Sequence, residues 1–461
     1  MQWQSCVRVL VGSTCAALVG CSVGTPYRRP DIPLPKEWNE PAPASVWPSA
    51  DWWHGFGSAR LDELIAEAER SNDDLAGAIA RVQEADAQAR IAGAPLLPSV
   101  DLNAAATRER SNVPTVGPSV FNNFNPGISA SYELDFWGKN RALRESGRAA
   151  AVGSRYDQET VALTVISSVA STYFQALELR DRIQVAQQNL RNGQKILRGF
   201  EFEQSVGTAT GLDVAQQATT VALLYAAIPP LEEQFRQTVY ALAVLIGKTP
   251  ESIDVTDGTL SELAAPAVLA GLPSELLTRR PDVASAEQQL VGANADITVA
   301  RAELFPSIDL TASGGYASSA LSSLVSPGNR AYAVSAGLMQ PIFHGGALRG
   351  ELSYRNARHA ELLTSYHKTV LTALANVESA LVAVRQTADQ RQRQRDAVST
   401  AKRAFAFAQA QMSAGTVNIL TVLNTENALF SAQDTLVQVE YSYLQALVDL
   451  YTALGGGWRR G

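Results

Sequence analysis

Side chains suited to chemistry are scarce in this sequence of 461 residues. Its three cysteines, Cys6, Cys15 and Cys21, all lie near the start. The remainder of the chain therefore has no thiol for a disulfide or a thiolate metal site. The four histidines are His54, His344, His359 and His367. No two of them are spaced to share a helical turn, and the three methionines offer no copper or zinc pathway, so no metal site is expected.

Motifs for catalysis and nucleotide binding are missing from the sequence. The run Gly455-Gly456-Gly457 lacks the spacing of a phosphate-binding loop and is typical of a helix terminator. No GxSxG nucleophile motif occurs either. A net charge of -7 and a pI near 5.3 give no basic surface for nucleic acid. The sequence therefore predicts a protein that is not an enzyme, has no catalytic residues and does not bind nucleic acid.

The one cysteine with an expected chemistry is Cys21. Residues 1–20 carry a single charge, Arg8, followed by an apolar run that is typical of a signal peptide. The run ends in Leu18-Val19-Gly20-Cys21, which has the form of a lipobox, where cleavage precedes a cysteine that is then acylated. An ordinary cleavage site beside an unrelated cysteine is the alternative. We expect a covalent lipid on Cys21, no other cofactor, and stable anchoring by several acyl chains. Ser22, in place of Asp, suggests sorting to the outer membrane by resemblance to other lipoproteins.

The elements around these residues repeat along the chain. Residues 72–102 align without a gap on residues 280–310, and both stretches end in a similar apolar-Pro-Ser-apolar-Asp-Leu run. At the same offset Val206-Gly207-Thr208 matches Ala414-Gly415-Thr416. The chain is therefore predicted to be a tandem duplication.

Within each half the hydrophobic period changes from helix to strand. An Ala-rich helix is expected over 72–95, followed by strands that alternate apolar and polar residues. These strands begin near Val100 and Ile128 in the first half, and near Ile308 and Tyr332 in the second. Each is long enough for a tilted transmembrane strand, and the stretches between them are rich in Ser, Asn, Pro and Gly. Four strands are thus predicted, with exposed loops over 108–126 and 317–330.

Very long helices follow each strand pair. Residues 143–203 and 349–412 contain no proline, and each would span about 90 Å at 1.5 Å per residue. Shorter helices are expected over 212–247 and 420–455, the first with a kink at Pro229-Pro230. A short helix and the helix before the strands together match the long helix in length. They could therefore lie end to end against it.

Four amphipathic strands cannot close a barrel, because membrane barrels begin at about eight strands and an open edge in lipid leaves backbone groups unpaired. Three copies would supply twelve strands around one axis, and the helices would continue this ring as a tube. A soluble sheet with one wet face is the alternative for the strands. A passive coiled-coil spacer or scaffold is the alternative for the helices.

Several stretches carry a family resemblance over nearly the whole mature chain. The most specific run is LLTRRPDV at 276–283, leading on to Phe305-Pro306-Ser307-Ile308. Others are Asp51-Trp52-Trp53, SYELDFWG at 131–138 and LAVLIG at 242–247. These residues resemble the outer membrane factor family, the TolC-like channels, and within it the OprM and NodT type of outer-membrane efflux lipoprotein. Thr298 departs from the Gly usual there, which is tolerable in a helix.

The resemblance implies an α+β membrane protein, a homotrimeric twelve-stranded β-barrel continued by a coiled-coil periplasmic tunnel and a mixed equatorial domain. It further implies passive export of drugs or other toxic small molecules across periplasm and outer membrane. A periplasmic adaptor and an inner-membrane transporter, of RND type, would be the partners. Metal-ion efflux, type I protein secretion and a structural lipoprotein remain alternatives. The predicted parts are a signal peptide (1–20), an anchored N-terminal segment (21–71), a first repeat (72–247), an equatorial linker (248–280), a second repeat (281–455) and a tail (456–461).

The resemblance also implies roles for two groups of residues. The turns Val206-Gly207-Thr208 and Ala414-Gly415-Thr416 match the tips that meet the adaptor, although a plain glycine helix cap explains them as well. Asp213 matches an aspartate of inter-helix bonds in the closed state, or is a first-turn carboxylate favoured by the helix dipole. Thr421 and Asn424 fall where some members place two aspartate rings. Cation selectivity at this aperture is therefore in doubt, because Thr and Asn rings would act by size and hydrogen bonding.

Overall fold

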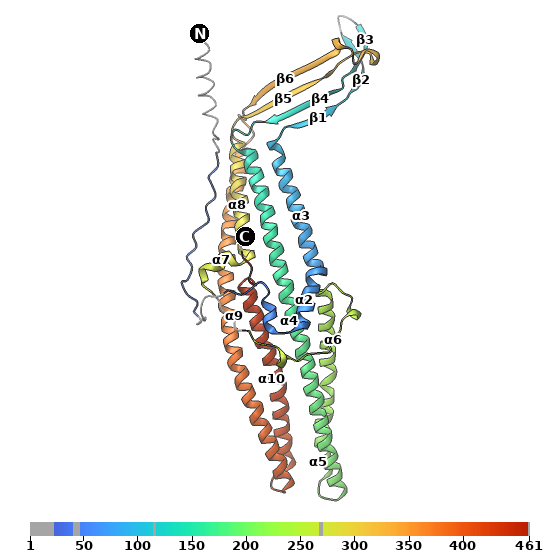
Figure 1. The fold of residues 1–461 in the computed structure, drawn as a ribbon, viewed down its shortest axis with the longest axis vertical. Helices are drawn as coiled ribbons and strands as arrows, with labels where there is room; N and C mark the ends of the chain where they lie inside the picture. The colour runs from blue at the N-terminus through green and yellow to red at the C-terminus, as the bar shows by residue number, and fades with distance from the viewer. Residues whose placement is uncertain (1–22, 40–46, 114–116, 267–270, 460–461) are drawn as a thin grey trace. The chain divides into compact units, whose positions relative to one another are not determined.

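The computed structural model describes residues 23–39, 47–113, 117–266 and 271–459 (Figure 1). The chain forms two compact units, each assembled from three stretches of sequence. Unit 1 comprises Met1–Asp31, Arg81–Arg155 and Ser285–His367, and unit 2 comprises Ile32–Ala80, Tyr156–Ala284 and Lys368–Gly461. The predicted signal peptide and Cys21 lie outside the described residues.

Unit 1 contains an antiparallel sheet in the order β1-β4-β5-β6 (Figure 1). Its strands are β1 (Ser99–Asn103), β4 (Gly127–Glu133), β5 (Ser307–Tyr316) and β6 (Arg330–Met339). Strands β4 and β5, from the two halves of the duplication, pair over seven residues from Gly127↔Gly315 to Glu133↔Asp309. The four predicted strands therefore form one sheet. The expected loop over 317–330 is confirmed, since the only helical or strand elements described between β5 and β6 are two short 3-10 turns.

The predicted loop over 108–126 is wrong for most of its length. Strands β2 (Ala106–Val113) and β3 (Gly117–Phe124) form a hairpin, paired from Ala106↔Phe124 to Val113↔Gly117. Polar residues dominate this segment, so it lacks the alternation that identifies a half-buried strand. Its backbone nevertheless completes a ladder, because strand pairing satisfies N–H and C=O groups whatever the side chains are. The first strand pair is consequently longer than predicted.

The helices agree closely with the prediction. The two long ones, α4 (Lys139–Ser205) and α9 (Ala347–Ser413), have 67 residues each. That length corresponds to about 100 Å at 1.5 Å per residue. The expected kink is a break at Ala227, after which Pro229 and Pro230 lie in the first turn of the next helix, where proline is tolerated. The other helices are α2 (Ala59–Ser71), α3 (Asp73–Gly93), α5 (Gly211–Ala226), α6 (Ile228–Leu245), α7 (Leu276–Arg279), α8 (Pro281–Ala302) and α10 (Ile419–Ala453).

Unit 2 is held together by an aromatic and aliphatic core. Trp52 stacks on Tyr451 with ring centroids 4.8 Å apart, and Phe56 meets the edge of Phe174 at 4.9 Å. Both Trp52 and Phe174 are buried in this core, together with Leu177 of α4. Helix α4 has a stretch long and apolar enough to span a membrane by composition. Because its large side chains here pack into the core, we interpret this stretch as a core helix.

The duplication is visible in equivalent contacts. Asn72 donates its side-chain amide to the carbonyl of Leu245 at 2.8 Å. At an offset of 208 residues, Arg280 donates to the carbonyl of Ala453, also at 2.8 Å. In both halves a polar side chain before a helix thus binds the C-terminal end of another helix, where carbonyls lack intrahelical partners. The internal duplication predicted from the sequence is confirmed by this shared arrangement.

Two glycines at the same offset permit this approach of chain segments. Gly247 and Gly455 have positive φ angles of 68° and 85°. A Cβ on Gly247 would lie 2.0 Å from the carbonyl oxygen of Ser71, and one on Gly455 would lie 2.0 Å from that of Arg279. No side chain larger than hydrogen fits at either position.

We expect Gly455→Ala to destabilise the protein more than Gly415→Ala. Both positions have positive φ, which costs a residue other than glycine about 1 to 2 kcal/mol. Nothing lies within 4 Å of a Cβ on Gly415. A Cβ on Gly455 would in addition clash with the backbone of Arg279. Thermal unfolding of the two purified variants measures the difference. Equal melting temperatures would show that the contact with Arg279 is not tight in solution.

Candidate functional site

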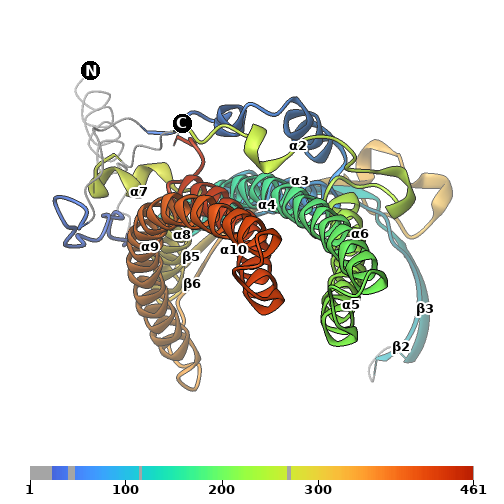
Figure 2. The ribbon, with the colours of Figure 1, turned by 90° about the horizontal axis from the view of Figure 1, so that it is seen from below.

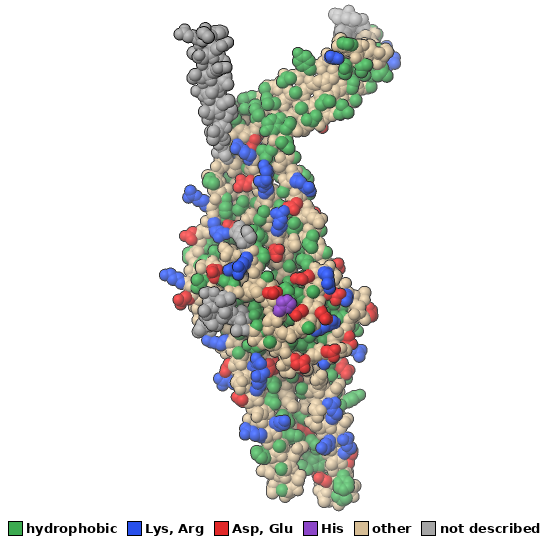
Figure 3. All heavy atoms as spheres, viewed as in Figure 1, with side chains coloured by type: hydrophobic (Ala, Val, Ile, Leu, Met, Phe, Trp, Pro, Cys, Tyr) green, Lys and Arg blue, Asp and Glu red, His purple; other side chains and the backbone are tan. Residues whose placement is uncertain are grey.

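The sheet of unit 1 has one polar and one apolar face. On the polar face hydroxyl and amide side chains bond across the strands: Ser99 to Ser131 at 2.8 Å, Asn103 to Ser129 at 2.7 Å, and Thr311 to Ser335 at 2.6 Å. On the other face apolar side chains are exposed, among them Leu102, Val334 and Leu338. Charged side chains are sparse on the visible face of these strands compared with the helices (Figure 3). Such a sheet fits a wall with lipid on one side and water on the other.

The four-stranded sheet ends at β1 and β6 among the described residues. The outer edges of β1 and β6 leave backbone N–H and C=O groups without a partner in the sheet. In lipid such groups have to be paired, so the sheet requires strands from other chains at both edges. The strand number predicted for one subunit of a closed barrel agrees with this requirement.

The helices of unit 2 form a second wall. Viewed along their length, α9, α10, α4 and the α5–α6 pair lie in one curved row (Figure 2). Ion pairs connect neighbours in this row: Arg182 of α4 meets Asp434 of α10 at 2.7 Å. Arg391 and Arg395 of α9 both meet Glu440 of α10 at 2.6 Å. The row is therefore joined by polar contacts between helices as well as by apolar packing.

The two predicted tips lie in equivalent helix-to-helix turns. After α4, Thr208 donates its backbone N–H to Glu203 at 2.8 Å, and Gly207 donates to Gln204 at 3.0 Å. After α9, Thr416 and Gly415 donate in the same pattern, to Gln411 at 2.9 Å and to Met412 at 2.8 Å. This is the Schellman arrangement, with glycine at positive φ. The cap interpretation is thus shown, while adaptor contact stays a prediction.

The side chains at these tips are solvent-exposed. Val206 is 58% exposed, and its counterpart Ala414 is also at the surface. The backbone of each turn is already satisfied by its own helix end. A partner docking here would therefore meet exposed side chains on a rigid cap.

Asp213 forms a capping box with Thr210. The hydroxyl and backbone N–H of Thr210 donate to the Asp213 carboxylate at 2.7 and 2.8 Å. These hydrogen bonds lower the pKa of Asp213 below its usual value. Within this chain the carboxylate therefore acts as the predicted first-turn residue of α5, and its role in bonds between helices stays a prediction.

Thr421 and Asn424 lie in the first two turns of α10. Asn418 caps this helix, and the hydroxyl of Thr421 donates to its side-chain oxygen at 3.2 Å. Asn424 is exposed one turn further along. The structure thus places both residues near the tip that contains Gly415. Their action as an aperture stays a prediction.

A functional candidate that the sequence analysis missed is Glu426. Its side chain is fully buried at 0% exposure, and neither carboxylate oxygen has a hydrogen-bond partner among the described residues. Burial raises the pKa of Glu426 to about 7, and the nearby Gln217 acts in the opposite direction. The sequence could have indicated its burial, because helical spacing places Glu426 on the same face of α10 as the buried Val422, Leu429 and Phe430.

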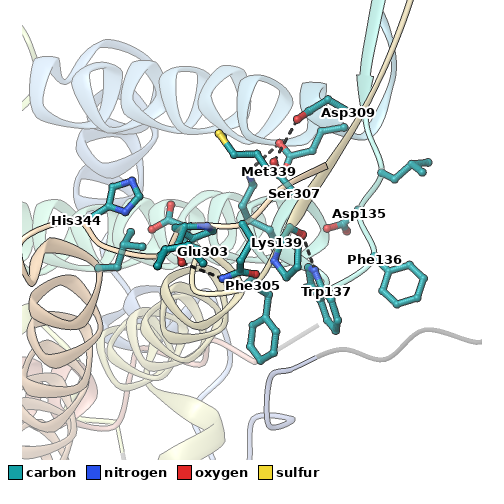
Figure 4. A pocket seen from close by; sticks show the side chains of 18 of the residues that line it. Asp135, Phe136, Trp137, Lys139, Glu303, Phe305, Ser307, Asp309, Met339 and His344 are labelled. Atoms are coloured by element: carbon teal, nitrogen blue, oxygen red, sulfur yellow. Dashed lines mark hydrogen bonds and ion pairs between the residues drawn. The ribbon is translucent and has the colours of Figure 1, made fainter. Parts of the chain in front are cut away.

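A large cavity lies at the helix-proximal ends of the strands in unit 1 (Figure 4). Its volume is about 870 Å³. Apolar walls come from residues such as Trp137, Phe305 and Phe343, and charged groups from Glu133, Lys139 and others. Within the described residues there is no group of three His, Cys, Asp or Glu side chains that could hold a metal ion.

An amphipathic sheet with two open edges, joined to helices of about 100 Å, defines the class of protein: one subunit of an outer-membrane channel with a helical tunnel.

Comparisons with known proteins give the family. The model of the outer membrane efflux protein family matches residues 64–248 and 272–456. The pyoverdine export outer membrane protein OpmQ of Pseudomonas putida is 40% identical over 453 residues, covering 96% of each chain. The cation efflux system protein CusC of Escherichia coli is 31% identical over 452 residues, covering 96% of this chain and 97% of that protein. The solved outer-membrane channel OprN aligns with a TM-score of 0.88 at 27% identity, covering 95% of this chain and 100% of that one.

The chain belongs to the outer membrane efflux protein family. The predicted fold class is confirmed: an α+β subunit contributes four strands to a trimeric twelve-stranded barrel that continues as a helical tunnel. The predicted function is confirmed as well, since the chain is the outer-membrane channel subunit of a tripartite efflux system. The family consists of channel proteins that extend into the periplasm and work with adaptors and inner-membrane transporters.

Proposed function

We propose that this chain is a lipid-anchored channel, acylated on Cys21, through which a small molecule leaves the cell passively. The energy for export comes from an inner-membrane transporter of the RND type, to which a periplasmic adaptor connects the channel. The observation that carries the proposal is the pairing of a lipid-compatible sheet with two 67-residue helices in each subunit. The chain supplies a conduit and no catalytic group.

A pyoverdine-type molecule is the cargo that the relatives favour. Two proteins named for pyoverdine export are 40% and 39% identical to this chain, whereas relatives named for toluene or cation efflux are 30 to 32% identical. The uncharged Thr421 and Asn424 at the proposed aperture place no fixed negative charge in the path of such a molecule. Metal cations are the second candidate cargo, because a cation efflux protein also matches 96% of the chain.

The proposed docking elements are the two tips, and a prediction tests them. We expect the double variant Val206→Asp, Ala414→Asp to lower export at least about tenfold, because loss of central contacts weakens an interface by that factor or more. Both side chains are exposed and bond to nothing at the tips, so the trimer should remain intact.

The measurement is the amount of pyoverdine, and separately of copper and toluene, exported by a deletion strain complemented with each variant. Ala265→Asp, which adds one aspartate at an exposed position between the repeats where the double variant adds two at the tips, is the control. Wild-type export by the double variant would exclude the tips as docking sites. Restoration of none of the three cargoes by the wild-type chain would refute the cargo assignments.

A further inference from the structure

A groove between helices α3 and α4 of unit 1 is strongly basic. Its volume is about 800 Å³. The charged residues that line it are Asp86, Arg90, Arg144, Arg148 and Arg155, all within unit 1. Four of these five side chains are arginines, and all four are exposed. We call this surface the basic groove, and it presents a net positive charge to its surroundings.

Helical spacing and close packing shape the basic groove. Arg144, Arg148 and Arg155 are separated by four and seven residues, which places them on one face of α4. The neighbouring Gly147 lets the two helices approach, because a Cβ there would lie 2.8 Å from a side chain of α3. The side chain of Arg144 passes over the end of α3, with its Cγ 3.5 Å from the position of a Cβ on Gly93. The arginines therefore project from two tightly packed helices.

Three of the four arginines have no acidic partner. Within the described part of the chain, Arg90, Arg144 and Arg148 make neither an ion pair nor a side-chain hydrogen bond, and the adjacent Glu145 makes no ion pair with them. Arg144 and Arg148 lie four residues apart on a helix, where like charges repel each other. An anion bound in the groove would relieve this repulsion.

Aromatic rings between the strands and these helices indicate the boundary of the membrane. Trp137, just before α4, stacks on Phe305, just before β5, with ring centroids 4.7 Å apart (Figure 4). Phe136 and Phe305 are 39% and 40% exposed. Exposed rings at strand ends are typical of the interface between lipid and water in barrels. The lipid head groups therefore adjoin the first turns of α4.

The unpaired arginines lie close to the depth of these head groups. Helix α4 begins at Lys139, and at 1.5 Å per residue Arg144 and Arg148 follow about 8 and 14 Å further from the strands. Arg90 lies three residues before the end of α3 that is nearer the strands. The head-group layer extends about 5 to 8 Å from the hydrocarbon. Figure 3 shows Lys and Arg side chains over the strand-proximal parts of α3 and α4, on the same face as apolar side chains of the strands.

We propose that the basic groove binds the phosphate of anionic phospholipids in the periplasmic leaflet of the outer membrane, through Arg90, Arg144 and Arg148. Arginine pairs with phosphate through two parallel N–H bonds. Basic pockets between helices beside a membrane surface are suited to such head groups. These contacts fix the depth at which each subunit sits in the membrane. The inference depends on the outer-membrane location of the family and not on the proposed lipid anchor or cargo.

The experiment is native mass spectrometry of the detergent-purified full-length trimer, titrated with phosphatidylglycerol and separately with phosphatidylcholine. The second lipid has the same phosphate, balanced by a choline cation. We expect phosphatidylglycerol to bind at least about tenfold more tightly. The triple variant Arg90→Gln, Arg144→Gln, Arg148→Gln should lower its affinity at least about tenfold, because each arginine near an anionic lipid surface contributes about fivefold. The trimer mass in the same spectrum shows that the variant has assembled, and Arg148→Gln alone, expected to cost about fivefold, replaces a triple variant that does not assemble.

Arg155→Gln is the matched control for Arg148→Gln. It removes the same charge from the same face of α4, but Arg155 lies about 24 Å from the start of the helix. Arg155 is also paired with Asp86 at 2.6 Å. Its loss should change the affinity for phosphatidylglycerol less than about twofold. Equal affinities for the two lipids, or an unchanged affinity in the triple variant, would overturn the proposal. Displacement of the lipid by an equal concentration of inorganic phosphate would show a site for free anions and would overturn it as well.

Discussion

Val334→Arg is expected to abolish assembly of the trimer, while Ser335→Arg is expected to leave it intact. Val334 projects from the apolar face of β6 and is 80% exposed within the chain. An arginine facing lipid near the membrane midplane costs about 2 to 4 kcal/mol, and three copies would multiply this cost to about 6 to 12 kcal/mol. This sum is comparable with the whole free energy of unfolding of a typical protein, about 5 to 15 kcal/mol.

The neighbouring Ser335 is the matched control, because successive strand residues face opposite sides. Its hydroxyl lies 2.6 Å from that of Thr311 on the polar face, which we assign to the water-filled lumen. The fraction of heat-resistant trimer in outer-membrane extracts gives the result. Equal loss of trimer in both variants would mean that the two faces are not lipid and water.

Glu426→Gln is expected to stabilise the protein above neutral pH and to remove a pH dependence. The pKa of about 7 in the folded chain lies above the ordinary value of 4.5, so the folded state binds the proton more tightly than the unfolded state. The stability that Glu426 itself contributes is therefore fully present below about pH 4.5 and is lost as pH rises through about 7. A shift of this size corresponds to about 3 kcal/mol at pH 8, which the neutral glutamine would recover.

The control for this prediction is Glu440→Gln, expected to have the opposite sign. Glu440 is paired with both Arg391 and Arg395, so its neutralisation leaves a partly buried guanidinium group on Arg391 and an exposed one on Arg395 without their partner. The measurement is the melting temperature of both variants and of the wild type at pH 5 and at pH 8. A wild-type protein that is equally stable at both pH values would show that water reaches Glu426.

Much of the fold could be predicted because its determinants are local. Long stretches without proline gave the helices, and the alternation after Val100, Ile128 and Ile308 gave the strands. The β2–β3 hairpin was missed because Arg108, Glu109 and Arg110 place charge on both of its faces, so no alternation marks it. Its pairing is a property of the backbone, which side-chain patterns do not encode.

The candidate site was predictable to a lesser extent. The tips followed from glycine and threonine at equivalent positions, and the structure gives both the same cap. Glu426 could have been found as a carboxylate within an apolar helical stripe. The basic groove could not, because Arg90 and Arg148 come from different helices and no local pattern relates them.

The most direct test of the central claim is the oligomeric mass and single-channel conductance of the detergent-purified mature protein, measured beside Cys21→Ala. We predict a conducting trimer for both, with the lipid acting as an anchor only. A monomer without conductance in both samples would contradict the channel and assign the long helices to a scaffold.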